Sequence, residues 1–414
     1  MNKNTKIITA AAAGVMVLVF AVVLIMGLGS DTAPRTEATT PSAQETQAQT
    51  LATEAEAKER AVLSFIGDCI IGSESGKVND GNFSWMARNK EHEYFFQKVY
   101  DVLKEDDLTV ANVECVLTDR DLEKTGKDYS PAFWFKAPAA DADILTKGSV
   151  EFASIVNNHT YDYGEEGYKD TVAALKAQGM YVGESLAPVY VEKNGIKIGI
   201  VCCNLWASYQ TSYIEDALKD MQDKCEYKIV IFHGGTEAVH EPDNYKIDAC
   251  RYLANSGLCD LIVGSHPHVL QPLEVVNGVP ILYSLGNFCY SANNYPENKT
   301  VIFQVQLERA GDKIITSTRL IPCYVYTGSI NAYQPAVMTD AQDINEVMAM
   351  METPVEHQTE PPSTAETSAP TEDPQTEPET VYVPDPTEAP TDAPWQDEQE
   401  PTDYVYSETQ VYQY

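Results

Sequence analysis

The chain has 414 residues, of which 43% are hydrophobic, enough for one sizeable folded domain with polar flanks. Its 62 acidic and 28 basic residues give a formal net charge of −34. A field of that sign repels nucleic acid, so the composition argues against a nucleic-acid partner. Much of the acidity lies near the C-terminus, where no Lys or Arg follows Arg319, so the folded part is less acidic than the total.

The N-terminal segment has the pattern of a membrane anchor. Lys3 and Lys6 precede an apolar run from Ile7 to Leu28, close to the ~20 residues that cross a bilayer as a helix. The run exceeds the ~7 to 15 residues of a signal-peptide core. We therefore predict a single-pass signal anchor at residues 1–29, with the bulk of the chain extracytoplasmic at the cell membrane. A cleaved signal peptide is the alternative.

Residues 30–60 are rich in Thr, Ala, Gln and Glu and contain no aromatic residue, which predicts a disordered spacer.

Residues 61–330 alternate β-branched apolar runs with helix-like stretches, which predicts an α/β domain. Helices are expected at Glu165–Gln178 and Asp243–Ser256, each followed by a glycine that can end a helix. Alternation of strand and helix favours parallel pairing in the centre, and the last strands, which lack intervening helices, favour an antiparallel portion. The expected strands are 61–67, 108–114, 151–157, 196–203, 227–233, 259–265, 278–286, 300–308 and 313–321.

The C-terminal part divides at about residue 354. Residues 331–353 have no assigned pattern, and residues 354–414 form an acidic tail rich in Pro, Thr and Glu, which predicts disorder. The nine cysteines include no CxxC pair, so neither a zinc ribbon nor a dense disulfide framework is indicated. Buried free thiols are the favoured interpretation, with one or two disulfides left open.

Five apolar runs end in residues that can bind a metal ion. Because ligands of open α/β sheets bind at the carboxyl ends of strands, side chains far apart in sequence can converge at one edge. Four of the six histidines in the domain occupy such positions, and Pro267 fixes an extended geometry between two of them. The candidate residues are Asp68, Glu114, Asn158, His159, His233, His266 and His268.

Carboxylate, amide and imidazole groups make a mixed oxygen and nitrogen donor set, which suits Mn, Fe or Zn better than Ca or Mg. The candidates are too numerous for one catalytic zinc and match two divalent transition metals that share a bridging carboxylate. A hydrogen-bonded rim role is the alternative for any one of these histidines taken alone.

Four further residues have two readings each. Asp162 either orients His159 or belongs to the turn before the helix. Glu237 and His240 either line the cleft or face solvent, and Asn287 either orients a ligand or is a plain turn residue.

Six segments together resemble the CapA-like poly-γ-glutamate capsule synthesis family, which is related to calcineurin-like metallophosphatases. They are "FIGDCIIG", "ANVECVLT", "FKAPAADADIL", "VNNHTYDYGEEGYKDTVAALKAQG", "HGGTE" and "IVGSHPHVLQPLEVVNGVPILYSLGNF". The resemblance covers roughly residues 61–330. It implies a metallophosphatase-like β-sandwich of two mixed sheets flanked by helices, and an extracytoplasmic role in making, anchoring or trimming a capsule polymer.

The resemblance also implies roles for individual residues. Asp68 and His268 would hold the first metal, and Glu114 would bridge the two ions. The second metal would be held by Asn158, His233 and His266. His159 would be the catalytic acid or cationic group facing the leaving atom. Beyond the resemblance, we predict that Asp162 takes part in catalysis with His159 and that Lys136 and Glu237 contact substrate.

Four positions depart from the family pattern. Ile70 stands where related phosphatases supply a His ligand, so the first metal would have one ligand fewer. Gly234 and Ala238 replace an aromatic pair, and Lys136 replaces an Arg, which keeps the charge but loses bidentate geometry.

The leading hypothesis is a metal-dependent hydrolase or transferase acting on poly-γ-glutamate or another anionic envelope polymer. One alternative is a non-catalytic scaffold that holds other capsule-synthesis membrane proteins together. A second alternative is a generic metallophosphoesterase.

Overall fold

The structure, a computed structural model, describes residues 60–127, 131–291, 297–328 and 330–358. The expected anchor, nearly all of the expected spacer and the tail after residue 358 lie outside the described residues. Within the described ranges, no helix is long and apolar enough to cross a membrane. All of these ranges fall in one compact unit.

The first sheet has eight strands, with β14 beside β1 and the others in the order β17-β16-β15-β1-β3-β6-β7. Strands β1, β3, β6 and β7 are parallel, as is β14 to β1, whereas β15, β16 and β17 continue the sheet in antiparallel pairing. The bounds are β1 Arg60–Ile70, β3 Leu108–Val113, β6 Phe152–Ser154, β7 Tyr181–Gly183, β14 Asn287–Tyr290, β15 Thr300–Ala310, β16 Lys313–Tyr324 and β17 Ala336–Val337.

The second sheet has six strands in the order β12-β13-β11-β10-β9-β8, and its inner strands are parallel. The bounds are β8 Val189–Lys193, β9 Ile196–Asn204, β10 Tyr227–His233, β11 Leu261–Ser265, β12 Leu270–Val276 and β13 Val279–Leu285. A small third sheet, which the sequence did not predict, joins β2 Ser73–Glu74, β5 Phe135–Ala137 and β4 Val116–Leu117.

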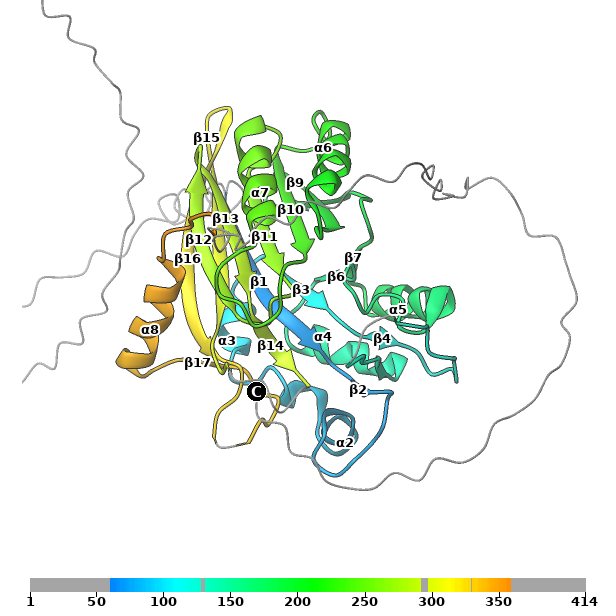
Figure 1. Cartoon of the computed structure of the whole chain (residues 1–414). Helices are drawn as coiled ribbons and strands as arrows, with labels where there is room; N and C mark the ends of the chain where they lie inside the picture. Colours follow the sequence, from blue (N-terminus) through cyan, green and yellow to red (C-terminus); the bar gives the residue numbers. More distant parts are fainter. Residues whose placement is uncertain (1–59, 128–130, 292–296, 329, 359–414) are drawn as a thin grey trace, which may run out of the picture. The chain divides into compact units, whose positions relative to one another are not determined.

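The two large sheets share one buried apolar core, to which β1 contributes Leu63 and Phe65 and the second sheet contributes Ile229 and Leu282. Helices cover the outer faces. The outer core of the first sheet includes side chains of α2 Phe83–Asn89, α3 Tyr100–Leu103, α4 Asp143–Lys147 and α5 Gly164–Ala177. On the second sheet, α6 Thr211–Asp220 and α7 Asn244–Ser256 lie side by side (Figure 1).

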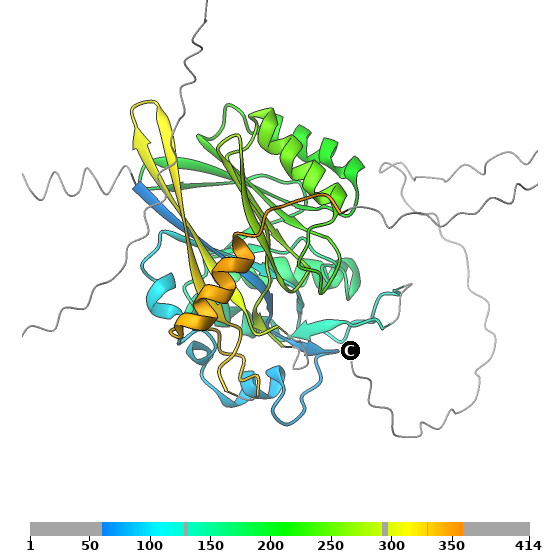
Figure 2. The ribbon, with the colours of Figure 1, turned by 60° about the vertical axis from the view of Figure 1, so that its left-hand side comes forward.

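Residues 331–353 contain β17 and a final helix, α8 Ala341–Met351. Asp340 caps α8 by accepting hydrogen bonds from the backbone N–H groups of Gln342 and Asp343. Val347 and Met351 of this helix are buried in the core between the sheets. Figure 2 shows α8 (orange) alongside β16, and it also contacts β12.

The alternation of apolar and polar runs predicted the main strands and both long helices to within a few residues. The expected strand 151–157 is shorter, because the chain leaves the sheet after Ser154 to form the loop that carries Asn158 and His159. Strands β8 and β12 and helix α6 were not predicted. All nine cysteines are buried free thiols, as the favoured interpretation had it.

Candidate metal centre

The candidate ligands lie at the carboxyl ends of parallel strands in both large sheets. Asp68 is near the end of β1, Glu114 follows β3, His233 ends β10, and His266 follows β11. Gly67, just before Asp68, lets β1 pass close to the backbone of Gly286, because a Cβ at this position would lie 2.0 Å from the carbonyl oxygen of Gly286. The side chains of Asp68 and Glu114 are completely buried, and the four histidines are at most 6% exposed.

Three of the predicted ligands surround His233 Nε2. This nitrogen lies 2.9 Å from Asn158 Oδ1, 3.0 Å from His266 Nδ1 and 3.7 Å from Glu114 Oε1. Two ligand atoms that each lie ~2.1 Å from one ion are ~3.0 Å apart at a right angle and ~3.4 Å apart at the tetrahedral angle. The spacing around His233 therefore fits donors that share an ion.

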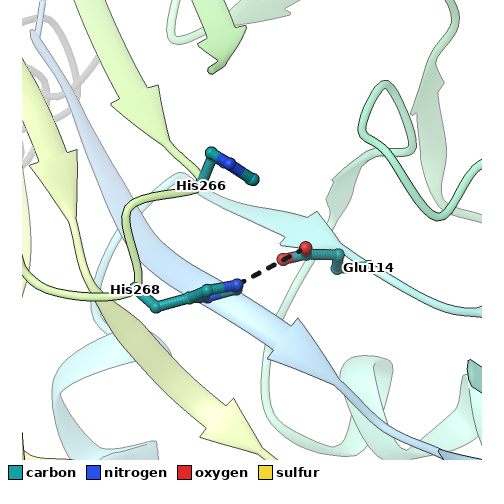
Figure 3. Close-up of side chains that lie close together, drawn as sticks. All are labelled: Glu114, His266 and His268. Carbon is teal, nitrogen blue, oxygen red and sulfur yellow. Dashed lines mark ion pairs between the residues drawn. The ribbon is translucent and has the colours of Figure 1, made fainter. Parts of the chain in front are cut away.

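The carboxylate of Glu114 lies between the histidines. Its Oε1 is 3.7 Å from His233 Nε2, 3.9 Å from His268 Nε2 and 4.0 Å from His159 Nε2, and it has no hydrogen-bond partner among the described residues. Figure 3 shows His268 pointing at this carboxylate, with His266 on the same loop. A buried oxygen without a donor is costly unless something else binds it. Its surroundings fit a bridging ligand for divalent ions.

Asp68 and His268 lie next to each other and close to Glu114. Asp68 Oδ2 lies 3.2 Å from His268 Nδ1, and Asp68 Oδ1 accepts a hydrogen bond from Asn112 Nδ2 at 2.8 Å. Asn287 Oδ1 lies 2.9 Å from His268 Nδ1, so this residue orients the imidazole as one of its two readings proposed. Two groups, Glu114 with His266 and His268, and Asp68 with Glu114 and His233, each have ligand atoms within 4.8 Å of one another.

The backbone at His266 and His268 adopts conformations that non-glycine residues rarely use. His266 has φ 103° and His268 has φ 60°. Such conformations cost free energy and concentrate at functional sites. The loop between β11 and β12 therefore aims both rings inward at the expense of backbone strain.

Burial and neighbouring charges separate the pKa values of the histidines. Burial, together with the charge of His268, lowers the pKa of His266 to about 2, and burial lowers the pKa of His233 as well. Burial alone would lower the pKa of His268, but the charges of Glu114 and Asp68 outweigh it and raise that pKa to about 9. Burial and the charge of Asp68 raise the pKa of Glu114. Neutral His233 and His266 are ready to bind a cation through nitrogen.

His159 is held by a buried chain of charged groups. Its Nδ1 lies 2.7 Å from Asp162 Oδ2, and Asp162 Oδ1 lies 2.6 Å from Lys127 Nζ. Asp162 Oδ2 also accepts the backbone N–H of Phe135 at 2.7 Å, and the Phe135 ring packs against His159 at 4.8 Å. Asp162 thus orients His159 so that Nε2 faces Glu114. Burial lowers the pKa of His159 despite the opposing charge of Asp162.

The two predicted substrate contacts differ in position. Glu237, which is more than half exposed, lies at the rim of the centre, with Oε1 3.9 Å from His266 Nε2. Lys136 donates to the carbonyl oxygen of Arg120 and lies over the Tyr163 ring, and no interaction among the described residues links it to a metal ligand. Ile70 has no donor atom in its side chain and is buried in the apolar core of the first sheet, so this position supplies no side-chain ligand.

Several residues around the centre were missed by the sequence analysis. Asn112 donates to Asp68 and, at 3.3 Å, to Glu114, and Asn157 donates to Asn112 Oδ1. Trp206 packs its ring edge-on against His266, with centroids 4.7 Å apart. The only available signal was that Asn112 and Asn157 closely precede strand-end ligands, because an amide inside an apolar run needs a polar partner.

Fold and site define an α/β protein of two packed mixed sheets with a candidate divalent-metal centre at the strand ends. The family model described as Bacterial capsule synthesis protein PGA_cap matches residues 62–292. This is more than half of the chain, which belongs to that family, and the resemblance to CapA-like proteins is confirmed.

Two curated relatives carry related descriptions. The PGA biosynthesis protein CapA of Bacillus subtilis (strain 168) is 26% identical over 270 residues, covering 60% of this chain and 68% of that protein. The capsule biosynthesis protein CapA of Bacillus anthracis is 24% identical over 319 residues, covering 70% and 72%. A solved structure, a hypothetical protein from Thermus thermophilus, has a TM-score of 0.40 at 14% identity and covers 63% of this chain and 99% of its own.

Proposed function

We propose that this protein is a membrane-anchored, extracytoplasmic hydrolase or transferase that depends on divalent transition metals. Its substrate is poly-γ-glutamate or another anionic polymer of the cell envelope. The observation that carries the proposal is Glu114 Oε1, a buried oxygen with no hydrogen-bond partner among the described residues, which lies within 4.0 Å of three imidazole nitrogens.

The donor set fits one or two ions of Mn, Fe or Zn. Asp68 and His268 would hold the first ion, Asn158, His233 and His266 the second, and Glu114 would contact both. A bound divalent ion would polarise the bond under attack and make a coordinated water more acidic. Asn112 and Asn287 keep the carboxylate of Asp68 and the ring of His268 in place through hydrogen bonds.

His159 supplies the proton-transfer group of the proposed reaction. Its Nδ1 is held by Asp162, so Nε2 points towards the centre. In the neutral ring Nε2 can accept a proton from the attacking group and then pass it to a leaving oxygen or nitrogen. Lys127 neutralises Asp162 at 2.6 Å. The ring of Trp206 packs against His266, and the ring of Phe135 packs against His159. These two aromatic side chains would limit the access of water to the site.

Metal analysis of the purified protein tests this proposal. We expect the parent chain to retain transition metal after gel filtration, and His233→Ala and His266→Ala to lose most of it. His240→Ala is the matched control, because His240 interacts with Glu297 and the Leu270 carbonyl instead of the ligand cluster. A parent chain that binds no transition metal at micromolar concentration would exclude the catalytic proposal.

A scaffold function is favoured by one observation, the burial of Ile70 in the core where relatives of the phosphatase type supply a ligand. If the protein only holds other capsule-synthesis membrane proteins together, replacing His159 and His268 leaves polymer production intact. If it is an enzyme, both replacements abolish production while the protein level is unchanged.

A further inference from the structure

A polar cavity lies beside the small third sheet. Its volume is about 180 Å³, smaller than the ~300 to 1,000 Å³ of pockets for drug-sized ligands, so it suits a small molecule or one end of a longer one. None of the candidate metal ligands lines it. The polar residues that do are Ser84, Arg88, Thr118, Asp119, Lys136 and Asp141.

Two buried groups in this cavity have incomplete hydrogen bonding. Ser84 is 3% exposed, and its Oγ has no partner within the described part of the chain. Asp141 is 8% exposed, and its carboxylate accepts no hydrogen bond from a described residue. It forms an ion pair with His92 Nε2 at 3.8 Å, which is too long for a hydrogen bond. Burial raises the pKa of Asp141 to about 6. A carboxylate and a hydroxyl in such a setting lack the donors that normally offset their burial.

Arg88 and Lys136, the two cationic residues of the cavity, have N–H groups that are not used in hydrogen bonds with described residues. Arg88 is exposed and makes no hydrogen bond or ion pair with any residue that the structure describes, yet its charge acts on Asp141 and lowers that residue's pKa. Lys136 Nζ donates to the Arg120 carbonyl oxygen at 3.0 Å, which leaves two of its three N–H groups. The guanidinium can bind a carboxylate through two parallel hydrogen bonds.

The charges of the lining restrict the ligand. Arg88 and Lys136 balance Asp119 and Asp141, so the cavity carries no net charge. An ion of one sign, such as phosphate or a metal ion, would pair with two of these groups and leave the two groups of its own sign without a counter-charge. A molecule with one positive and one negative group close together meets both sets.

We propose that this cavity binds the head group of an α-amino acid, with its carboxylate on Arg88, its ammonium on Asp141 and a hydrogen bond from Ser84. Two sources present this head group. One is a free amino acid. The other is the amino end of a γ-linked glutamyl chain, whose first residue keeps both groups on its α-carbon, and this second source rests on the proposed function. The cavity shares no residue with the metal centre, so binding there requires neither metal nor catalysis.

Calorimetric titration of the full-length chain at neutral pH tests the proposal, with L-glutamate and γ-L-glutamyl-L-glutamate as probes. N-acetyl-L-glutamate lacks the ammonium and 4-aminobutanoate lacks the α-carboxylate, and each should bind at least about tenfold more weakly than L-glutamate, since a charged hydrogen bond is lost. Arg88→Gln and Asp141→Asn should weaken the probes by a similar factor. The matched controls Arg319→Gln and Asp143→Asn, outside the cavity, should not.

Ser84→Ala separates binding from folding. Because the hydroxyl has no partner in the cavity, its removal should leave the unfolding temperature unchanged or raise it, while binding weakens. Preference for the dipeptide assigns the site to a chain end, and preference for L-glutamate assigns it to the free amino acid. The proposal would be overturned if neither probe binds at concentrations up to about 10 mM. It would also be overturned if the two analogues bind as tightly as L-glutamate, or if Arg319→Gln weakens binding as much as Arg88→Gln does.

Discussion

Replacing Glu114 with Gln should have opposite effects on the metal-free and metal-bound protein. Glu114 Oε2 accepts from Asn112 Nδ2 at 3.3 Å, so the new amide nitrogen would take the place of Oε1 and face the imidazoles. The amide can donate to a neutral ring nitrogen, whereas the carboxylate oxygen has no donor among the described residues. Without metal, the substitution therefore removes an unfavourable buried charge.

The size of this effect follows from the cost of a buried group without a partner. That cost is ~1 to 3 kcal/mol, and each kcal/mol shifts the melting temperature of a domain of this size by ~2 to 4 °C. We expect metal-free Glu114→Gln to melt a few degrees above the metal-free parent. The pKa of His268 should fall at the same time, because Glu114 is the largest influence that raises it.

Metal should reverse the order of stability. An ion at 100 times its dissociation constant stabilises the parent by ~2.7 kcal/mol, and the variant should lose most of that gain with the bridging ligand. Differential scanning fluorimetry after chelation, and again after addition of Mn²⁺ or Zn²⁺, measures both states. The reasoning is refuted if the chelated variant is less stable than the chelated parent, or if both gain equally from metal.

Three further predictions concern other buried groups. Burial raises the pKa of Asp106 to about 7, so the stability that this residue contributes is complete below about pH 4 and is lost as the pH rises through 7. Asp106→Asn should therefore reduce the difference between the unfolding free energies measured in urea at pH 5 and pH 8. An unchanged difference would contradict the assignment. Asp162→Asn should lower kcat by ~10- to 100-fold with little change in KM, because the ring of His159 loses its orienting carboxylate, and an unaltered kcat would remove His159 from the reaction. Lys246→Met should lower the free energy of unfolding by ~1 to 3 kcal/mol, because it leaves Gln271 Oε1 and the Gly234 carbonyl without their donor. The exposed control Lys219→Met should change the free energy of unfolding by less than ~0.5 kcal/mol. Equal effects of the two substitutions would show that the buried contact contributes nothing.

The positions of the candidate ligands at strand ends could be predicted from sequence, because each follows an apolar run that is recognisable from its own few residues. Each buried strand is followed by a polar residue at the point where the strand ends, as at His233 and His266. Parallel pairing then brings these strand ends together. The strand pairing behind this convergence was inferred correctly from alternation alone.

The surroundings of the ligands could not be predicted because they depend on contacts between distant segments. Lys127 reaches Asp162 from a loop with no regular pattern, and Trp206 reaches His266 from the segment after β9. Lys136 was expected at the substrate site, but its position on β5 depends on the small sheet, whose strands of two or three residues are too short to show a period.

The most direct test of the metal centre is a crystal structure of the protein grown with Mn²⁺ or Zn²⁺, with data collected at the absorption edge of the metal. We predict an anomalous peak within ~2.0 to 2.3 Å of a Glu114 oxygen and of His233 Nε2. A second peak beside Asp68 and His268 would establish the two-ion centre. A fully occupied metal elsewhere on the protein, with no peak bonded to Glu114, would contradict the proposed function.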